Sequence, residues 1–225
     1  MTRTKLADRQ LPVYTRGEDI FNMVTHIVGG GLGVVAMILC IIRAALHHSA
    51  LGVVSSIIYG CSLIILFTMS SIYHGLNPRH DTAKKVFQIL DHCTIFLLIA
   101  GSYTPVLLCS IMPYDPAAAW TMFAIVWIAA AVGITLNAID IKRFKTFSMI
   151  CYLAMGWCIV FKFNVLPDTI GWNAIILLIL GGIAFTVGTI FYGAQKKVHY
   201  MHSIWHLWIL AGAILHFFAI FLYVL

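Results

Sequence analysis

The chain has 225 residues, of which 61% are hydrophobic and only 10% are charged, and its mean hydropathy is +0.96. A soluble domain averages about 25% charged residues, so this composition excludes an ordinary soluble protein and indicates an integral membrane protein. The formal net charge of +6 would suggest nucleic acid in another setting. In a membrane protein, however, short basic loops set the orientation, and we expect no nucleic-acid partner.

Seven apolar segments follow a polar N-terminal segment of residues 1–19. Each is close to the ~20 residues that cross a hydrocarbon core of ~30 Å. We expect membrane spans over residues 20–42, 52–74, 90–111, 117–139, 147–165, 172–194 and 202–224. The loops between them are short, which makes neighbouring spans antiparallel and leaves no room for a second domain. The sequence therefore predicts an all-α integral membrane protein, with a seven-transmembrane helix bundle over residues 20–225.

The basic residues indicate how this bundle is oriented. With the N-terminus in the cytoplasm, twelve of the fourteen Lys and Arg residues, Lys196 and Lys197 among them, lie on the cytoplasmic side. Only Arg43 and Lys162 lie on the other side. Because cytoplasmic loops carry the excess of Lys and Arg, we expect a cytoplasmic N-terminus and a C-terminus outside the cell.

Three histidines are candidate metal ligands. His202 and His206 lie four residues apart at the start of the last span, and this spacing lets one helix face hold one metal ion. The second span ends at His74, which the expected topology places near the same cytoplasmic surface. Three neutral imidazoles and one open position are typical of a catalytic zinc site. We therefore predict that His74, His202 and His206 bind Zn²⁺.

Two further residues are candidates for catalysis at this metal. Asp91, at the start of the third span, would orient or deprotonate the metal's water rather than bind the ion itself. Ser70 lies one turn before His74 on the same helix face and would steady a ligand or a bound water. The alternatives are chance pairing of histidines and a purely structural hydrogen bond. We adopt the structural interpretation for His216, which lies too deep for this cluster.

Motifs spread along nearly the whole chain resemble those of one known family. In chain order they are Glu18-x3-Asn22-x2-Thr25-His26, Ser70-x3-His74, Leu90-Asp91 leading to Gly101-Ser102-x2-Pro105, and His202-x3-His206. With these motifs the chain resembles the progestin and adipoQ receptor family, and within it the bacterial haemolysin III branch.

The resemblance implies a fold, a cofactor and a range of functions. It implies a seven-helix bundle with its N-terminus inside, in a bacterial inner (plasma) membrane. It also implies a zinc ion held by His74, His202 and His206, with Asp91 and Ser70 near the metal-bound water. Some eukaryotic relatives are associated with hydrolysis of ceramide-like lipid amides, whereas bacterial members are linked to haemolysis or to membrane homeostasis.

Three functions remain open at this point. The first is a zinc-dependent hydrolase of membrane lipids, such as ceramide-like amides. The second is a non-enzymatic regulator or sensor of membrane state, in which zinc is a structural clamp. The third, a lytic pore, is disfavoured because a pore needs a polar stripe through the bundle, whereas the ionisable residues here cluster at one membrane face. The last span has no lysine for a retinal Schiff base, while haem ligation by paired histidines stays open.

Overall fold

The computed structural model describes residues 3–195 and 198–225, and every regular element in that part of the chain is a helix. Lys196 and Lys197, two of the twelve basic residues on which the orientation rests, lie outside the described residues. The α-helices are α1 (Arg16–Leu46), α2 (Ala50–Gly75), α3 (Asp81–Pro105), α4 (Pro116–Asp140), α5 (Lys145–Trp157), α6 (Leu166–Ala194) and α7 (Met201–Ala219). Shorter helical pieces are η1 (Leu6–Asp8), η2 (Val106–Ile111), η3 (Cys158–Lys162) and η4 (Ile220–Val224).

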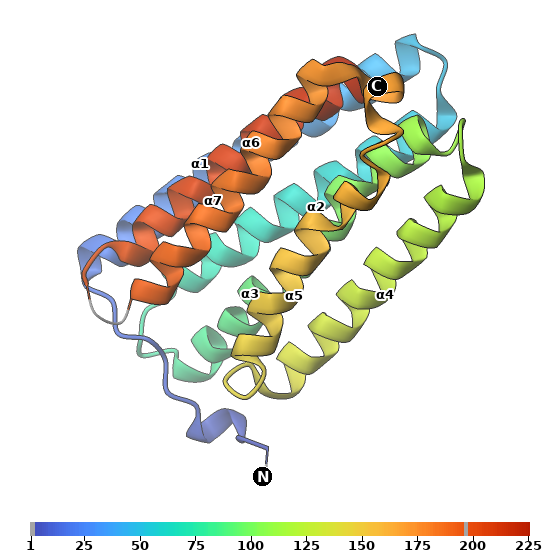
Figure 1. Cartoon of the computed structure of the whole chain (residues 1–225). Helices are drawn as coiled ribbons and strands as arrows, with labels where there is room; N and C mark the ends of the chain where they lie inside the picture. The colour runs from blue at the N-terminus through green and yellow to red at the C-terminus, as the bar shows by residue number, and fades with distance from the viewer. Residues whose placement is uncertain (1–2, 196–197) are drawn as a thin grey trace.

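The helices lie roughly side by side in one elongated bundle (Figure 1). α1 packs along α2, α6 packs along α7, and α1 also contacts α7, which closes one side of the bundle. α3 continues from α2 through the interior and contacts α4 and α5 on the other side. The core between these layers contains large buried side chains, including Phe67, Phe96 and Leu107.

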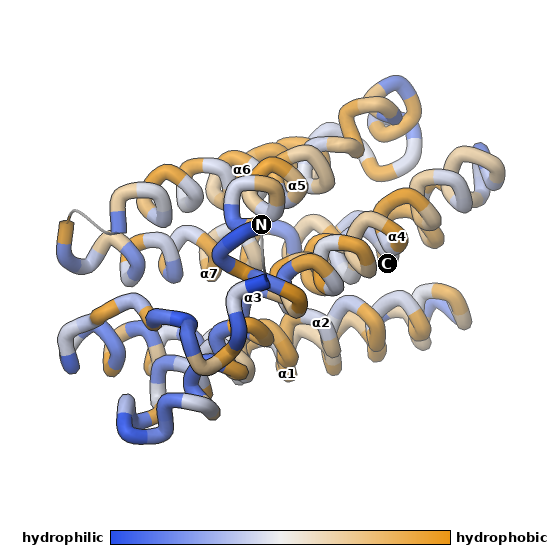
Figure 2. Tube along the Cα trace, turned by 90° about the horizontal axis from the view of Figure 1, so that it is seen from below, coloured by the Kyte–Doolittle hydropathy of each residue, from blue (hydrophilic) through white to orange (hydrophobic). Residues whose placement is uncertain are grey.

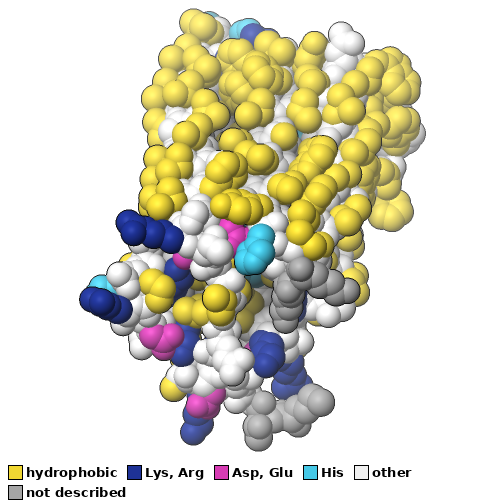
Figure 3. All heavy atoms as spheres, turned by 90° about the vertical axis from the view of Figure 1, so that its left-hand side faces the viewer, with side chains coloured by type: hydrophobic (Ala, Val, Ile, Leu, Met, Phe, Trp, Pro, Cys, Tyr) yellow, Lys and Arg dark blue, Asp and Glu magenta, His cyan; other side chains and the backbone are white. Residues whose placement is uncertain are grey.

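Among the described residues, six helical segments are long and apolar enough to cross a membrane. They are α1, α2, α3 with η2, α4, α6, and α7 with η4. On the face shown in Figure 3, hydrophobic side chains cover most of the bundle, whereas most of the charged side chains gather at one end. The same end carries the polar segment before α1 (Figure 2). The chain is therefore a multi-pass helical membrane protein, as its composition predicts.

The fifth expected span is the one for which the structure gives no support. Residues 147–165 fall in α5, which has only 13 residues, in the 3₁₀ turn η3, and in the loop that follows. At 1.5 Å per residue α5 is about 20 Å long, shorter than a ~30 Å hydrocarbon core. The bundle of seven helices is thus present, while the seven crossings and the positions of the two termini stay predictions.

The start of α1 is fixed by a capping box and by a link to α7. The Thr15 side chain accepts a hydrogen bond from the Glu18 backbone N–H at 3.2 Å, and Glu18 Oε2 accepts one from the Thr15 backbone N–H at 2.8 Å. Glu18 Oε1 also accepts a hydrogen bond of 2.7 Å from the backbone N–H of Tyr200. Tyr200 precedes α7 and has a left-handed φ of 62°, which is uncommon for a residue with a side chain. Glu18 therefore stabilises the turn from which α7 begins.

Two glycines allow close helix contacts. A Cβ atom on Gly29 of α1 would lie 2.7 Å from the Phe67 ring of α2. A Cβ atom on Gly181 of α6 would overlap the ring of His216 on α7. Small residues at such positions let helix backbones approach closely in membrane proteins.

Candidate metal centre

Three histidine side chains converge at the polar end of the bundle. His74 comes from the last turn of α2, and His202 and His206 come from the first two turns of α7. His74 Nε2 lies 3.3 Å from His202 Nε2, and His206 Nε2 lies 3.1 Å from His202 Nε2. One nitrogen of each ring lies within 4.8 Å of those of the other two. The structure thus brings together the three residues predicted as metal ligands.

The spacing and burial of the three rings are compatible with one zinc ion. Zinc–nitrogen bonds of 2.0–2.1 Å in a tetrahedron separate the nitrogens by about 3.3–3.4 Å, which is close to the two contacts of 3.1 and 3.3 Å. All three rings are nearly inaccessible to solvent. Two N–H groups cannot face each other at this distance, so at least one nitrogen of each contacting pair carries a lone pair. The cluster therefore offers the neutral imidazole lone pairs that a divalent ion binds.

A carboxylate orients the first of these rings. His74 Nδ1 lies 2.9 Å from Asp19 Oδ1, and Lys84 Nζ lies 3.2 Å from the other carboxylate oxygen of Asp19. Metal-binding histidines commonly donate their second N–H to a carboxylate, which fixes the ring and its tautomer. Donation from Nδ1 leaves the lone pair of His74 on Nε2, the nitrogen that faces His202.

Two aromatic rings, one from the segment before α1 and one from α1 itself, pack against the cluster. Tyr14, in the segment before α1, stacks on His202 with ring centroids 4.9 Å apart. His26 of α1 stacks on His206 with centroids 3.8 Å apart and ring planes at 17°. Neither ring nitrogen of His26 has a hydrogen-bond partner among the described residues, although the ring is buried. These two rings pack against the rings of His202 and His206 and help to hold them in place.

The two predicted catalytic residues are buried, and each has one oxygen without a hydrogen-bond partner among the described residues. Ser70 is fully buried on α2, one turn before His74, and its Oγ has no hydrogen-bond partner in the described part of the chain. Asp91 is buried on α3, and its Oδ2 makes no hydrogen bond in the described part of the chain, although it lies 3.5 Å from His92 Nδ1. Buried polar groups normally have partners, so these two atoms are available to a ligand or a water. Their catalytic roles stay predictions.

Other histidines have structural partners. His92 Nε2 lies 3.0 Å from the Tyr192 hydroxyl, and its Nδ1 lies 2.9 Å from the Gln88 carbonyl oxygen. His216 donates from Nε2 to the Leu178 carbonyl oxygen on α6 at 3.2 Å, as its structural interpretation predicts.

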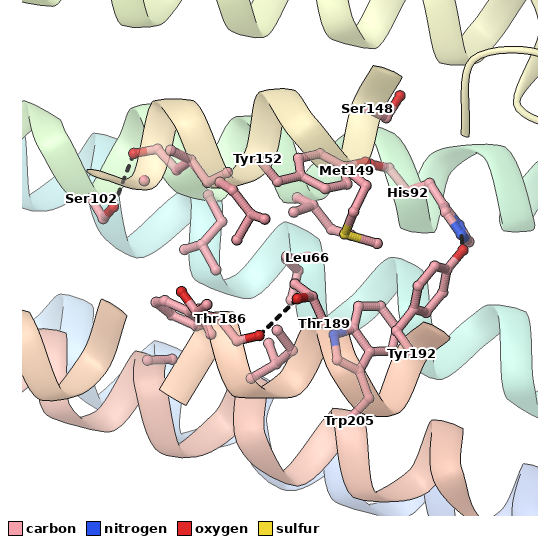
Figure 4. A pocket seen from close by; sticks show the side chains of 18 of the residues that line it. Leu66, His92, Ser102, Ser148, Met149, Tyr152, Thr186, Thr189, Tyr192 and Trp205 are labelled. Carbon is pink, nitrogen blue, oxygen red and sulfur yellow. Dashed lines mark hydrogen bonds between the residues drawn. The ribbon is translucent and has the colours of Figure 1, made fainter. Parts of the chain in front are cut away.

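A cavity lined by residues of α2, α3, α5, α6 and α7 runs into the bundle (Figure 4). At its polar end the lining includes Asp91, His92, Tyr192 and also His26, whose ring stacks on His206. Figure 4 shows His92 and Tyr192 facing each other at this end and Ser102 at the other. Asp91 and Tyr103 both line the cavity, and the helix rise between them gives it a length of about 18 Å. Most of the remaining lining is aliphatic or aromatic.

Residues 14–217 match the model of a protein family described as haemolysin-III related. The chain belongs to the haemolysin III-related family. Among curated relatives it is 39% identical over 208 residues to Hemolysin-3 of Bacillus cereus, with 92% of each chain covered. It is 37% identical over 211 residues to the Hemolysin-3 homolog of Bacillus subtilis, covering 94% of this chain and 96% of the relative.

A more distant relative of this haemolysin III-related protein is human. The monocyte to macrophage differentiation factor of Homo sapiens is 28% identical over 169 residues, which cover 74% of this chain and 68% of the human protein. The resemblance to the progestin and adipoQ receptor family, and to its haemolysin III branch, is thereby confirmed.

Sequence reasoning missed three parts of this haemolysin III-related site. It assigned no role to Asp19, Tyr14 or the ring of His26. Asp19 directly follows Glu18 of the first motif, and His26 ends that motif, so this pattern was a signal that could have directed attention to both. Nothing in the local sequence marks Tyr14, because its contact with His202 is made across the fold.

Proposed function

We propose that this protein binds one zinc ion through His74, His202 and His206 and hydrolyses an amide bond of a membrane lipid of the ceramide-like class. The observation that carries the proposal is the position of the three histidines beside the polar end of an apolar cavity. Such a cavity suits the acyl chain of a lipid, while the reactive group of that lipid would lie at the polar end.

The chain's own residues have separate roles in this reaction. Zinc would supply a Lewis acid that polarises a carbonyl group and would allow hydrolysis by water at neutral pH. Asp91 lines the cavity and acts as the general base. Its Oδ2 makes no hydrogen bond among the described residues and lies 3.5 Å from His92 Nδ1. Ser70 holds the polar group of the substrate through its hydroxyl. The aliphatic side chains of α3, α5 and α6 bind the acyl chain and exclude water.

The proposed setting is the bacterial plasma membrane, with the N-terminus and the histidine cluster at the cytoplasmic face. The gathering of charged side chains at the end of the bundle that carries the N-terminus supports this orientation, because basic residues are enriched on the cytoplasmic side. Membrane lipids are then both solvent and substrate.

A second candidate function is a non-enzymatic regulator of membrane state, with zinc as a clamp. It is favoured by one observation: the three ligands come from two different helices, α2 and α7, so a bound ion would tie these helices together. Part of the free energy of zinc binding would then stabilise the fold.

The hydrolase is tested with purified protein and a panel of defined lipid amides and esters. We expect turnover to depend on zinc and to be lost in His202→Ala. Trace amounts of other divalent ions should not restore it. The matched control is His216→Ala, which leaves the cluster intact. A zinc-loaded protein that is inert toward the whole panel would exclude the hydrolase and leave the clamp.

A further inference from the structure

Residues 3–15, which we call the N-terminal strap, lie across the end of the bundle where the histidines converge (Figure 2). The strap brings the Tyr14 ring onto His202, with centroids 4.9 Å apart and ring planes at 26°. The same ring lies 5.4 Å from the ring of His74. The Tyr14 hydroxyl donates a hydrogen bond of 3.1 Å to Gln195 Oε1, at the end of α6. Tyr14 therefore covers two of the three proposed ligands and is itself fastened to a third helix.

The other end of the strap is attached to α3 and α4. Arg9 Nη2 donates to the Ile139 carbonyl oxygen at 2.9 Å, and the Thr4 backbone N–H donates to Asp140 Oδ2 at 2.8 Å. Lys85 Nζ donates to the Ala7 carbonyl oxygen at 3.0 Å. Charged donors make the stronger class of hydrogen bonds. The strap is thus held at several points by residues that lie far from it in the sequence.

One of these attachments is incomplete. Arg9 is 6% exposed, yet its Nε and Nη1 have no hydrogen-bond partner among the described residues. A buried donor without a partner costs free energy relative to a hydrated one. Lifting the strap would hydrate these two nitrogens, which lowers the free-energy cost of opening. The strap is thus attached in a way that permits it to open.

We propose that the strap controls exchange of the metal between the histidine cluster and the aqueous phase, and that Tyr14 is a positioning residue for His202. The inference rests on the proposed zinc binding, but it does not depend on hydrolysis. The closed strap separates the histidines from bulk water at the end of the bundle, whereas a lipid reaches them through the cavity. Zinc release then requires the Tyr14 ring to leave His202.

The test is the rate at which the zinc-loaded full-length protein, in detergent, releases zinc to excess EDTA. Tyr14→Ala removes the covering ring, and we expect release to be faster by about tenfold or more, with an affinity loss within the 10–100-fold typical of supporting residues. Tyr14→Phe keeps the ring but loses the bond to Gln195, so an intermediate rate is expected. Arg9→Ala removes one attachment of the strap without touching a histidine. It should accelerate release while the equilibrium affinity stays within about twofold, because Arg9 is outside the supporting shell of the ligands. The matched control is Tyr114→Ala, an exposed tyrosine in another loop.

The outcomes separate the two proposals. Unchanged release rates in both Tyr14→Ala and Arg9→Ala would overturn the strap, even if lipid turnover is found. Faster release in a protein without lipid turnover would support the strap and contradict the hydrolase. A protein that takes up no zinc would overturn both. If Tyr14→Ala fails to fold, as judged by circular dichroism, Arg9→Ala and Tyr14→Phe decide the question.

Discussion

Asp19 and His74 form a hydrogen-bonded pair in which Oδ1 of the carboxylate lies 2.9 Å from Nδ1 of the imidazole, on the side of the ring opposite to the other histidines. The pair joins the first turn of α1 to the last turn of α2. A carboxylate in this position raises the basicity of the ring nitrogen that binds a metal. The relationship gives the proposed zinc site a support that can be removed without changing a ligand.

Replacing Asp19 should weaken zinc binding without abolishing it. In Asp19→Asn the negative charge behind His74 is lost, and we expect the affinity to fall by about 10–100-fold. Competition titration with a chelator of known affinity measures the effect. Asp168→Asn, at an exposed position near the start of α6, is the control and should bind zinc like the wild type. An equal affinity in Asp19→Asn would show that the carboxylate does not support a metal ligand.

Removal of the ligands themselves should abolish binding. His74→Ala, or His202→Ala combined with His206→Ala, is expected to leave no stoichiometric zinc in elemental analysis of the purified protein, because too few of the three nitrogens remain. His216→Ala and His47→Ala should retain one zinc per chain. Full zinc content after the loss of His74 would mean that α2 takes no part in the site.

Asp91→Asn distinguishes the hydrolase from the clamp. The substitution keeps the shape of the side chain but removes the proton acceptor, so turnover should fall by roughly 100-fold or more if proton transfer matters. Zinc content is measured in the same preparation and should be retained, with an affinity loss of no more than about 10–100-fold. Retained zinc together with an intact cellular phenotype would leave the clamp as the better proposal.

The cavity predicts a dependence on the length of the lipid chain. Ser102 lines the end of the cavity remote from the histidines, and Ser102→Phe would fill part of that end. We expect turnover of long-chain lipid amides to decrease and that of short-chain amides to change little. Ile190→Phe, at an exposed position of α6, is the control. The same loss for every chain length would contradict a binding site for the acyl chain in this cavity.

A salt bridge at the opposite end predicts a pH dependence of stability. The Ala118 backbone N–H and the Lys162 ammonium group, each 3.0 Å from an Asp115 carboxylate oxygen, lower the pKa of Asp115 below its ordinary value of 3.8. A lowered pKa means that the ionised form stabilises the fold above the unfolded-state pKa, and that this contribution is lost as the pH falls through the folded-state pKa. Asp115→Asn should therefore melt earlier than the wild type at pH 7, and the difference should shrink in strongly acidic buffer. A difference independent of pH would show that the charge is not the cause.

The sequence predicted the parts of the fold that depend on hydrophobicity and helix spacing. It placed seven helices in order, and it identified His202 and His206 from their four-residue separation and His74 from its place at a span end. It did not predict that α1 begins at Arg16, although the pattern Thr15-x-x-Glu18 is a recognisable capping box. A hydrophobic segment marks only the part of a helix that lies in the membrane. The helix itself can continue into polar residues until it reaches its cap.

The remaining features depend on contacts between distant segments. α5 ends at Trp157 and continues as a 3₁₀ turn, and hydropathy does not distinguish this from a continuous helix. Tyr14 and His202 are neighbours only because the strap crosses the bundle end, and no local pattern encodes that course. Asp19 supports His74 because α1 and α2 pack side by side. Which faces of the two helices meet is set by their packing in the folded protein, and the local sequence does not specify it.

The histidine cluster also constrains the order of events during biosynthesis. His202 lies 128 residues after His74 in the chain, and at a synthesis rate of 5–20 residues per second this interval lasts roughly 6–26 s. Throughout that time the nascent protein contains one ring of the three, so the site is completed only when the final helix has emerged and packed against α1. The proposed metal site therefore exists only in a chain that includes α7, and truncation anywhere before α7 would eliminate it.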